Sequence, residues 1–286
     1  MVFAIPREGK TYVGTTDTVY KADIAHPTMT EEDRDYVLSA IHFMFPDVAL
    51  GPEDIESSWA GLCPLIHEDG KDPSEISRKD EIFVSDSGLI SIAGGKLTGY
   101  RKMAESVVDR VATNLNNMTG ATYPPSATKH LPISGGDVGG AAGFIVYTAD
   151  QLVEGINLGL TEDEVRLVIN RYGSNVKTVF DFCRKEAELA EESGLDPLVY
   201  AMLRYALVYE SCYKPVDFFI RRTGALFFDI NWVHKYKEAV IAYMANQFSW
   251  STEQVETYME ELEQLLYEAT NPVDDYITEK EIQKVK

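Results

Sequence analysis

Apolar and polar residues alternate at the start of the chain in two short runs. The runs cover residues 2–5 and 11–16, and the polar segment 6–10, which contains proline and glycine, separates them. Alternation with a period of two around a short polar turn is typical of two paired strands. The first 16 residues therefore predict a β-hairpin.

A helix is predicted after Thr30. Asp33 follows at the spacing of a capping box, apolar residues then recur on one helical face, and Pro46 ends the pattern. We expect this helix to cover a sheet. Residues 55–64 and 82–93 are predicted to be extended, because apolar and β-branched residues lie there between Gly, Pro and Asp. The charged stretch between them, 68–80, predicts a loop.

The most informative stretch lies at residues 89–101, where an apolar run passes through Gly94-Gly95 into a helical pattern. It predicts a buried strand followed directly by a helix whose first turn holds Lys96. The apolar face of that helix is formed by Met103, Val107, Val108 and Val111. Glycines and free N–H groups at a helix start favour negative charge, such as a phosphate or the pyrimidine edge of a reduced flavin. A plain strand-to-helix turn is the alternative on spacing alone.

Turn-forming residues dominate 113–143, and helical signals dominate the rest. Capping signals stand at Thr161, at Asp196 before a proline, and at Ser251. We therefore predict an α+β fold with three parts: a sheet-containing domain at 1–112, a linker at 113–143 and an all-α domain at 144–286.

Composition narrows the class of protein. The 286 residues are 45% hydrophobic and 25% charged, which is ordinary for a globular protein, and the formal net charge is −20. Nucleic acid is not expected as a partner, because no overall positive charge would attract its backbone. Three cysteines without a CxxC pair predict a reducing, cytoplasmic location. The five histidines lack metal-ligand spacing, so no metal is expected. No apolar run is long enough to span a bilayer.

Three side chains are candidates for chemistry, and each also has an ordinary structural interpretation. Cys63 has no basic neighbour in sequence, which favours a small buried side chain over an activated thiolate. Arg78 lies in the charged loop, where a solvated surface role is expected. Lys96 opposes the helix dipole in its predicted position, so either a negative ligand compensates it or it extends into solvent.

Five segments of the front half resemble bacterial FAD-dependent glycerol-3-phosphate dehydrogenase. They are residues 3–6, 14–21, 59–65, 76–80 and 93–102. Residues 171–174, 201–206 and 219–223 resemble the C-terminal domain of that family. The resemblance covers nearly the whole chain and implies a remnant of a mixed-sheet FAD-dependent oxidoreductase domain, of the DAO type, followed by a helical domain.

The resemblance also implies an activity and a site. Family members oxidise sn-glycerol 3-phosphate to dihydroxyacetone phosphate and pass electrons through FAD to a quinone at the membrane. Transferred residue by residue, Lys96 becomes the catalytic residue and also binds substrate, and Arg78 binds the substrate phosphate. The flavin contacts would come from Gly94, Gly95, Lys96, Leu97 and Thr98. The implied location is the cytoplasm, at the inner face of the cell membrane, and the implied assembly is a homo-oligomer.

Two departures from the family pattern matter. Cys63 stands where the family has a phosphate-binding arginine, so impaired substrate binding is expected. The GxGxxG segment that holds the FAD pyrophosphate is missing, so the chain corresponds to the C-terminal half of the enzyme and is expected to be inactive alone. Two alternatives remain: another FAD-linked oxidase of small hydroxy or amino acids, and a non-catalytic interaction module that binds a basic partner through its acidic helices.

Overall fold

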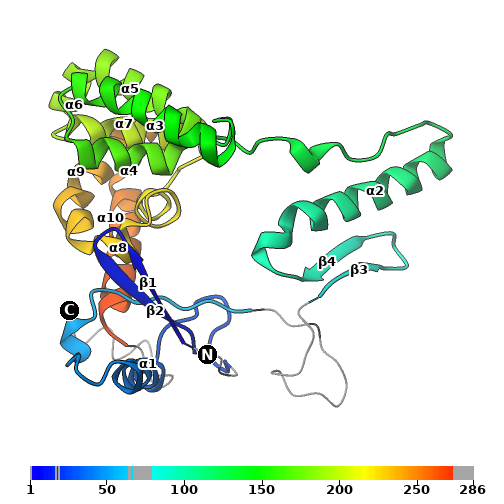
Figure 1. Ribbon diagram of the computed structural model, residues 1–286, viewed down its shortest axis with the longest axis horizontal. Coiled ribbons are helices and arrows are strands. Elements are labelled where there is room, and N and C mark those ends of the chain that lie inside the picture. The colour runs from blue at the N-terminus through cyan, green and yellow to red at the C-terminus, as the bar shows by residue number, and fades with distance from the viewer. Residues whose placement is uncertain (1, 17, 19, 64–65, 67–78, 273–286) are drawn as a thin grey trace. The chain divides into compact units, whose positions relative to one another are not determined.

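The computed structural model describes residues 2–16, 18, 20–63, 66 and 79–272 (Figure 1). The chain divides into two compact units. One takes in Met1–Gly61 and Ser134–Lys286, and the other takes in Leu62–Ile133. The first residues of the chain thus belong to the same unit as the helical domain, although residues 62–133 separate them in sequence. The predicted domain boundaries at 112 and 143 remain predictions.

The predicted N-terminal hairpin is present. Strand β1 (Phe3–Arg7) pairs antiparallel with β2 (Lys10–Gly14), and Arg7 faces Lys10 across the turn. The turn is shorter than predicted, because only Glu8 and Gly9 connect the strands. Both have positive φ, 51° and 79°, which is the geometry of a tight two-residue hairpin turn.

Helix α1 (Glu31–Met44) also confirms its prediction. The N–H of Asp33 donates to Thr30 Oγ1 at 3.2 Å, and the Asp33 carboxylate accepts from the Thr30 N–H. No side chain of α1 is buried, so the expectation that α1 packs over a sheet is not met among the described residues. Beyond the short 3₁₀ turn η1 (Pro52–Asp54), residues 55–63 form no strand.

The second unit contains a hairpin where one extended segment was predicted at 82–93. Strands β3 (Asp80–Val84) and β4 (Ile90–Gly94) pair antiparallel, with Ile82 opposite Ile92. The sequence Ser85-Asp86-Ser87-Gly88 makes the turn, and Ser85 Oγ accepts from the N–H of Leu89 at 3.2 Å. The prediction of a buried strand before Gly94 was wrong, because half-buried and exposed residues alternate along β4.

The helix after the glycines is α2 (Tyr100–Thr119), and the 3₁₀ turn η2 (Leu97–Gly99) precedes it. Gly120, at φ 71°, ends α2 as a left-handed cap. Residues 113–119 of the predicted linker are therefore helical, and so are its last residues, 140–143, which begin α3 (Gly140–Asn157). A further 3₁₀ turn, η3 (Thr128–His130), lies between these helices.

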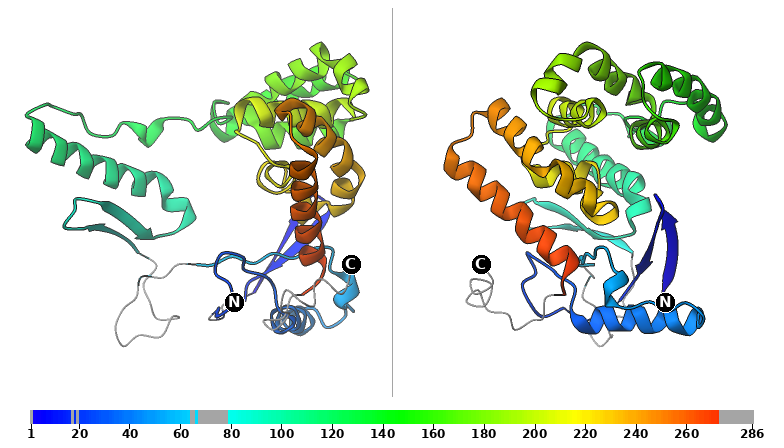
Figure 2. Two further views of the ribbon diagram at one scale, coloured as in Figure 1. Left: turned by 180° about the vertical axis from the view of Figure 1, so that it is seen from behind. Right: turned by 90° about the vertical axis from the view of Figure 1, so that its left-hand side faces the viewer.

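The helical domain begins with α3 and closes around one apolar core. Its elements are α3 (Gly140–Asn157), α4 (Glu162–Tyr172), η4 (Gly173–Asn175), α5 (Val176–Lys185), α6 (Ala187–Glu192), α7 (Pro197–Tyr209), the π-helix η5 (Asp217–Arg222), α8 (Ala225–Phe228), α9 (Ile230–Phe248) and α10 (Thr252–Thr270). The predicted caps at Thr161, Asp196 and Ser251 all accept backbone N–H groups. Helix α7 is the most buried element, and α9 and α10 pack side by side (Figure 2).

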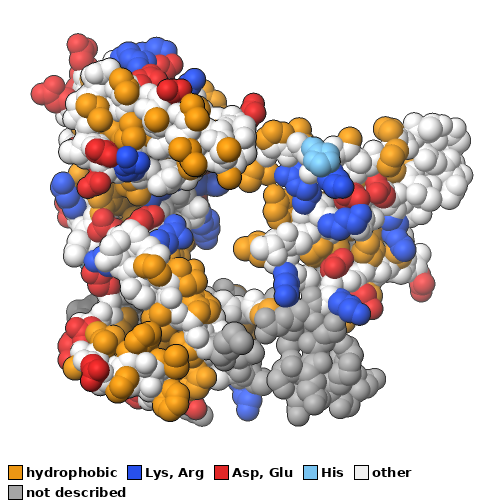
Figure 3. Space-filling view, in the orientation of Figure 1, with side chains coloured by type: hydrophobic (Ala, Val, Ile, Leu, Met, Phe, Trp, Pro, Cys, Tyr) orange, Lys and Arg blue, Asp and Glu red, His pale blue; other side chains and the backbone are white. Residues whose placement is uncertain are grey.

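Apolar side chains also remain on the surface of this unit. Phe43 and Met44 at the end of α1 are 85% and 64% exposed, and Ile145 of α3 is 73% exposed. The visible face carries hydrophobic side chains over α1 as well as over the helical domain (Figure 3). In the part of the chain that is described, no helix is long and apolar enough to cross a membrane.

An aromatic cluster attaches the N-terminal segment to the helical domain. Trp59 packs against Phe227 and Phe228 of α8 with ring centroids 4.8 and 5.5 Å apart, and Tyr12 of β2 contacts Phe228 at 5.9 Å. Backbone pairing supports the cluster, because the N–H of Ser58 donates to the carbonyl of Ala269 at 2.7 Å. These contacts explain why residues 2–61 form one unit with the helices.

Candidate functional site

Gly94 and Gly95 have φ of 77° and 82°, which side chains rarely adopt. The chain's own packing also requires glycine here. A Cβ on Gly94 would lie 2.3 Å from the carbonyl oxygen of Lys79, and one on Gly95 would lie 2.7 Å from the sulfur of Met103. The two glycines therefore let β4 pass close to the chain before β3 and then turn toward α2.

The turn that follows the glycines is open to solvent. Lys96 is extended, with φ −101° and ψ 146°, and its carbonyl accepts the N–H of Gly99 at 2.8 Å. Lys96 and Thr98 are exposed, and Leu97 is 91% exposed. The N–H groups of these three residues precede the first intrahelical hydrogen bond, so they are oriented like the free donors of a helix start.

The predicted place of Lys96 in the first turn of the helix was wrong. The helix begins at Tyr100, four residues later, and Lys96 caps the 3₁₀ turn instead. The helix dipole acts mainly within the first turn, so it places little electrostatic penalty on the Lys96 cation. Sequence periodicity could not distinguish a 3₁₀ turn from the start of an α-helix.

The other predicted substrate ligands are only partly described. Cys63 is exposed, so the interpretation of a small buried side chain was wrong. Arg78 lies outside the described residues. The structure thus brings Gly94 to Thr98 together on one turn, and their functional roles stay predictions.

The remaining cysteines have no marks of reactivity. Cys183 and Cys212 lie in the helical domain, and burial raises the pKa of each thiol to about 12. A thiol with such a pKa stays protonated near neutral pH and is a poor nucleophile. Among the described residues, no group of His, Cys, Asp and Glu side chains could hold a metal ion.

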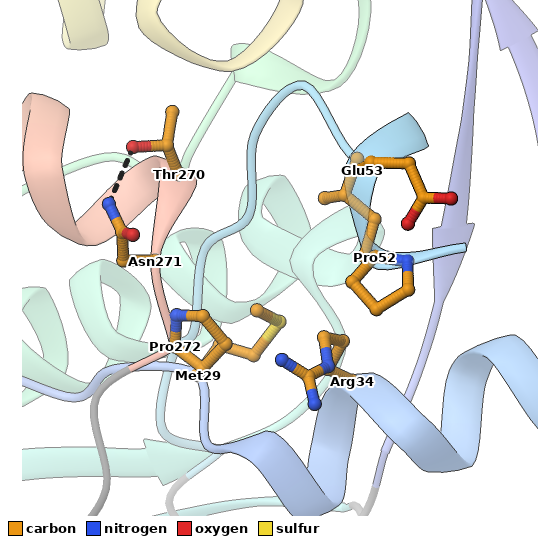
Figure 4. Close-up of a pocket in the computed structure, with 8 residues that line it drawn as sticks. Met29, Arg34, Pro52, Glu53, Thr270, Asn271 and Pro272 are labelled. Carbon is orange, nitrogen blue, oxygen red and sulfur yellow. Dashed lines mark hydrogen bonds between the residues drawn. The ribbon is translucent and has the colours of Figure 1, made fainter.

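Two hollows lie within the unit that contains the helical domain. The smaller, about 290 Å³, lies where the start of α1, the η1 turn and the end of α10 meet, and its wall includes Met29, Arg34, Pro52 and Asn271 (Figure 4). Asn271 Nδ2 donates to Thr270 Oγ1 at 3.0 Å beside it. None of the predicted site residues lines this hollow.

The larger hollow, about 510 Å³, is lined from the tip of the β1–β2 hairpin and from the helical domain. Its lining includes Arg7, Arg171, Arg221 and Arg222, and we call it the arginine hollow. None of these four side chains was predicted from the sequence to have a function. The available signal was that two stretches resembling the C-terminal domain, 171–174 and 219–223, contain three of the four arginines.

Comparison with known proteins finds related sequences for both units. Residues 1–101 match the family described as FAD dependent oxidoreductase. Residues 126–255 match the family described as the C-terminal domain of alpha-glycerophosphate oxidase. The fold therefore combines part of a FAD-dependent oxidoreductase domain with a helical C-terminal domain, which confirms the predicted fold class.

Similar whole proteins agree with these matches. Aerobic glycerol-3-phosphate dehydrogenase of Bacillus subtilis (strain 168) is 53% identical over 274 residues, covering 96% of this chain and 49% of the enzyme. The Staphylococcus aureus (strain USA300) enzyme is 49% identical over 269 residues, covering 94% of this chain and 48% of the enzyme. The solved glycerol-3-phosphate dehydrogenase of Bacillus halodurans, complexed with FAD, superposes with a TM-score of 0.86 at 51% identity, covering 96% and 52% of the two chains.

The matches and the fold define a class, the FAD-dependent oxidoreductases. Within that class, the chain is a homologue of aerobic glycerol-3-phosphate dehydrogenase, as the sequence motifs predicted. It spans about half the length of the curated relatives that it matches.

Proposed function

We propose that the chain forms the substrate side and the helical domain of a flavoprotein that oxidises sn-glycerol 3-phosphate to dihydroxyacetone phosphate and passes electrons through FAD to a quinone. About 50% identity to glycerol-3-phosphate dehydrogenases supports the reaction. The observation that carries the proposal is the turn from Gly94 to Thr98, which has exposed residues and free backbone amides and lies in one of the segments that resemble the family.

The residues of this turn suit the edge of a flavin ring. The glycines present backbone without side chains, the N–H groups of Lys96, Leu97 and Thr98 can donate to negative charge, and exposed Leu97 offers an apolar contact. When bound, FAD supplies the acceptor for the hydride. The turn's role is to bind and orient the ring and to stabilise charge on its pyrimidine edge.

Two cations are assigned to the substrate. Lys96 is exposed on the turn and would place its ammonium group beside the substrate phosphate or the developing alkoxide. Arg78 would grip the phosphate with its planar guanidinium, which matches two phosphate oxygens. Both assignments follow the family motifs, and a phosphorylated substrate would account for the use of two cations.

Cys63 weakens phosphate binding at this site in our proposal. A neutral thiol cannot replace the arginine that the family pattern has at this position. Loss of one charge-assisted contact to a bound phosphate costs about 2 to 4 kcal/mol, or roughly 30- to 1000-fold in transition-state binding. Because Cys63 is exposed, an arginine could be introduced there without disturbing a packed core.

The isolated chain is expected to bind FAD weakly and to be inactive alone. Its 286 residues contain no GxGxxG segment, which holds the pyrophosphate of a dinucleotide at a helix start. Purified chain should therefore show no stoichiometric flavin absorbance. Glycerol-3-phosphate-dependent dye reduction by the chain alone would contradict this part of the proposal.

A chimera tests the function directly. The chain would replace the matching half of the Bacillus subtilis relative, and flavin absorbance and glycerol-3-phosphate-dependent dye reduction would be measured separately. We expect a flavin-loaded protein with low kcat/KM, which Cys63→Arg raises by about 30-fold or more. Lys96→Ala should abolish turnover, whereas the exposed Lys129→Ala, in the same unit, should not. A loaded chimera that is inactive with either residue at position 63 would refute the proposal.

Two other functions are less well supported. Another FAD-linked oxidase of small hydroxy or amino acids would not need Lys96 and Arg78, and the chimera would then oxidise an unphosphorylated substrate. A non-catalytic interaction module would use the acidic helix faces, such as Glu253 and Glu260 of α10. The quinone acceptor, a cytoplasmic location at the inner face of the membrane, and a homo-oligomer are parts of the proposal that follow from the family alone.

A further inference from the structure

The lining of the arginine hollow is rich in positive charge, although the chain as a whole is negatively charged. The chain carries a formal charge of −20, yet the hollow's lining holds Arg7, Arg171, Arg221 and Arg222 and one carboxylate, that of Glu8. Glu8 Oε1 lies 3.5 Å from Arg7 Nε, so this carboxylate pairs with one of the four arginines. Four like charges around one concave surface repel one another, and a concave surface focuses their field. Such a surface attracts anions.

Neighbouring carboxylates do not saturate these guanidinium groups. Arg221 Nη1 donates to Asp217 Oδ1 at 2.8 Å, but the other oxygen of Asp217 accepts the N–H groups of Tyr213 and Lys214 at 3.0 and 2.9 Å. Asp217 therefore secures the loop before η5 and uses only one of the five donors of Arg221. The Arg221 side chain is 60% exposed, so its other donors can meet a ligand.

Arg171 and Arg222 have even fewer acidic contacts. Arg171 Nη1 lies 3.6 Å from Met202 Sδ, a weak acceptor, and Arg222 donates to the backbone carbonyl of Glu210. Burial raises the pKa of the Glu210 carboxyl, while the two arginines lower it. Its buried Oε2 accepts no hydrogen bond from the residues described. Glu210 thus offsets part of this charge through electrostatic attraction, while its Oε2 occupies none of the guanidinium donors.

The backbone at the hollow has two unusual conformations. Element η5 is a π-helix, in which the N–H of Thr223 donates to the carbonyl of Phe218 at 2.9 Å, and it ends on Arg221 and Arg222. Across the hollow, Glu8 has φ 51° in the hairpin turn beside Arg7. π-Helices and left-handed residues other than glycine are uncommon and are concentrated at binding sites.

The hollow also has apolar lining residues. Phe227, Phe228, Ile220 and Leu167 line the same hollow. Phe228 also fixes one of the cations, because the guanidinium carbon of Arg7 lies 4.2 Å from the centroid of its ring. A lining that holds both guanidinium groups and apolar side chains suits a ligand that has a charged oxyanion and a carbon part.

We propose that the arginine hollow binds a small organic phosphate. Planar guanidinium forks pair with phosphoryl oxygens two at a time, and several of them match a dianion better than a monovalent carboxylate. The same hollow is lined by arginines and by aromatic rings, so its lining can contact both a phosphate and the carbon atoms attached to it. The hollow lies outside the segment 62–133 that contains Gly94 to Thr98, and the proposal does not depend on flavin chemistry.

Calorimetric titration of the whole 286-residue chain tests the proposal. The probes are phenyl phosphate, inorganic phosphate, which lacks the ring, and benzoate, which has the ring but one charge. We expect phenyl phosphate to bind more tightly than either. Arg171→Gln and Arg7→Gln should each weaken its binding about tenfold, and raised salt should weaken it further. Arg166→Gln is the matched control on α4, because Arg166 pairs with Glu162 and does not line the hollow.

Thermal melting monitored by circular dichroism tests whether each variant folds. If Arg171→Gln does not fold, Arg7→Gln replaces it in the titration, because Arg7 lies on the exposed hairpin. Equal losses in Arg166→Gln and Arg7→Gln would overturn the proposal, as would equal binding of benzoate and phenyl phosphate. A lipid headgroup is the other source of such a phosphate. In that case the chain would sediment with phosphatidylglycerol vesicles in a way that depends on these arginines, and yet not bind phenyl phosphate. That result would assign the arginines to a membrane surface and reject a small-molecule site.

Discussion

Trp59 lies with its ring centroid 4.8 Å from that of Phe227, although 168 residues separate the two along the chain. One belongs to the segment after α1 and the other to α8 of the helical domain. Ser57 adds to the same junction, because its Oγ donates to the carbonyl of Phe227 at 2.6 Å. The N-terminal hairpin is therefore held by aromatic packing and not by sheet pairing with the helical domain.

Trp59→Ala should loosen the attachment of the hairpin, although Tyr12 and Arg7 keep their contacts with Phe228. Trp59 is 47% exposed, so its loss removes part of an aromatic side chain's burial and its ring contacts, about 1 to 3 kcal/mol of unfolding free energy. Hydrogen exchange should speed up at residues 3–14, and chemical denaturation should show the loss. Phe43→Ala, whose ring is 85% exposed, is the control and should change neither measurement.

Gly94→Ala should destabilise the β3–β4 unit more than Gly88→Ala. Both positions have positive φ, 77° and 84°, so both substitutions add backbone strain of about 1 kcal/mol. Only at Gly94 would the new Cβ meet backbone, at 2.3 Å from the carbonyl oxygen of Lys79, whereas Gly88 has open space. Denaturation of both variants gives the comparison, and equal losses would contradict the close approach of the chain at Gly94.

Alkaline pH should reduce stability between about pH 9 and 12. Burial raises the pKa of Cys183 and Cys212 from 9.0 to about 12, so the unfolded chain releases thiol protons in this range while the folded chain keeps them. The stability is complete below pH 9 and is lost as pH rises, by at most about 1.4 kcal/mol per pH unit and group. Burial also raises the pKa of Tyr200 and Tyr172, which acts in the same direction.

The measurement is the free energy of unfolding against pH for Cys212→Ala. This variant should show a shallower decline than the parent chain across the alkaline range. The exposed thiol of Cys63 provides the control, because Cys63→Ala should leave the slope unchanged. A parent-like slope in Cys212→Ala would show that the buried thiol contributes nothing to the pH dependence.

Limited proteolysis should first cut the chain between α2 and α3, at 120–139. That stretch is mostly exposed and holds only the short η3 turn. The aromatic cluster predicts that residues 2–61 stay bound to the helical domain after a cut, and size-exclusion chromatography should detect both pieces together. Trp59→Ala should let them separate, and early separation of the unmodified pieces would argue against the cluster.

Local signals in the sequence predicted the elements well. The capping residues Thr30, Thr161 and Ser251 start helices as expected, because a side chain that accepts a backbone N–H acts within three residues. The apolar run that passes through Gly94-Gly95 into a helical pattern located the turn. Its backbone geometry was less predictable, since whether Lys96 caps a 3₁₀ turn or enters the helix depends on packing around Gly95 and Met103.

Contacts between residues far apart in the chain could not be predicted from the sequence. Nothing local to Arg7 indicates that it would stack on Phe228, and the arginine hollow requires residues from the hairpin, α4 and η5 together. The burial of Cys63 was predicted incorrectly for the same reason. A cysteine is usually buried, but its exposure depends on which distant segments cover it.

The junction of Trp59 with α8 has a consequence for biosynthesis. The hairpin and Trp59 leave the ribosome well before Phe227. Because the segment 62–133 lies between them in sequence, the chain must close a long loop before Trp59 and Phe227 can meet. During that interval, apolar rings of the nascent chain have no native surface to cover them, which invites chaperone capture. The N-terminal hairpin is therefore translated early but can complete its packing only after α8 has been made.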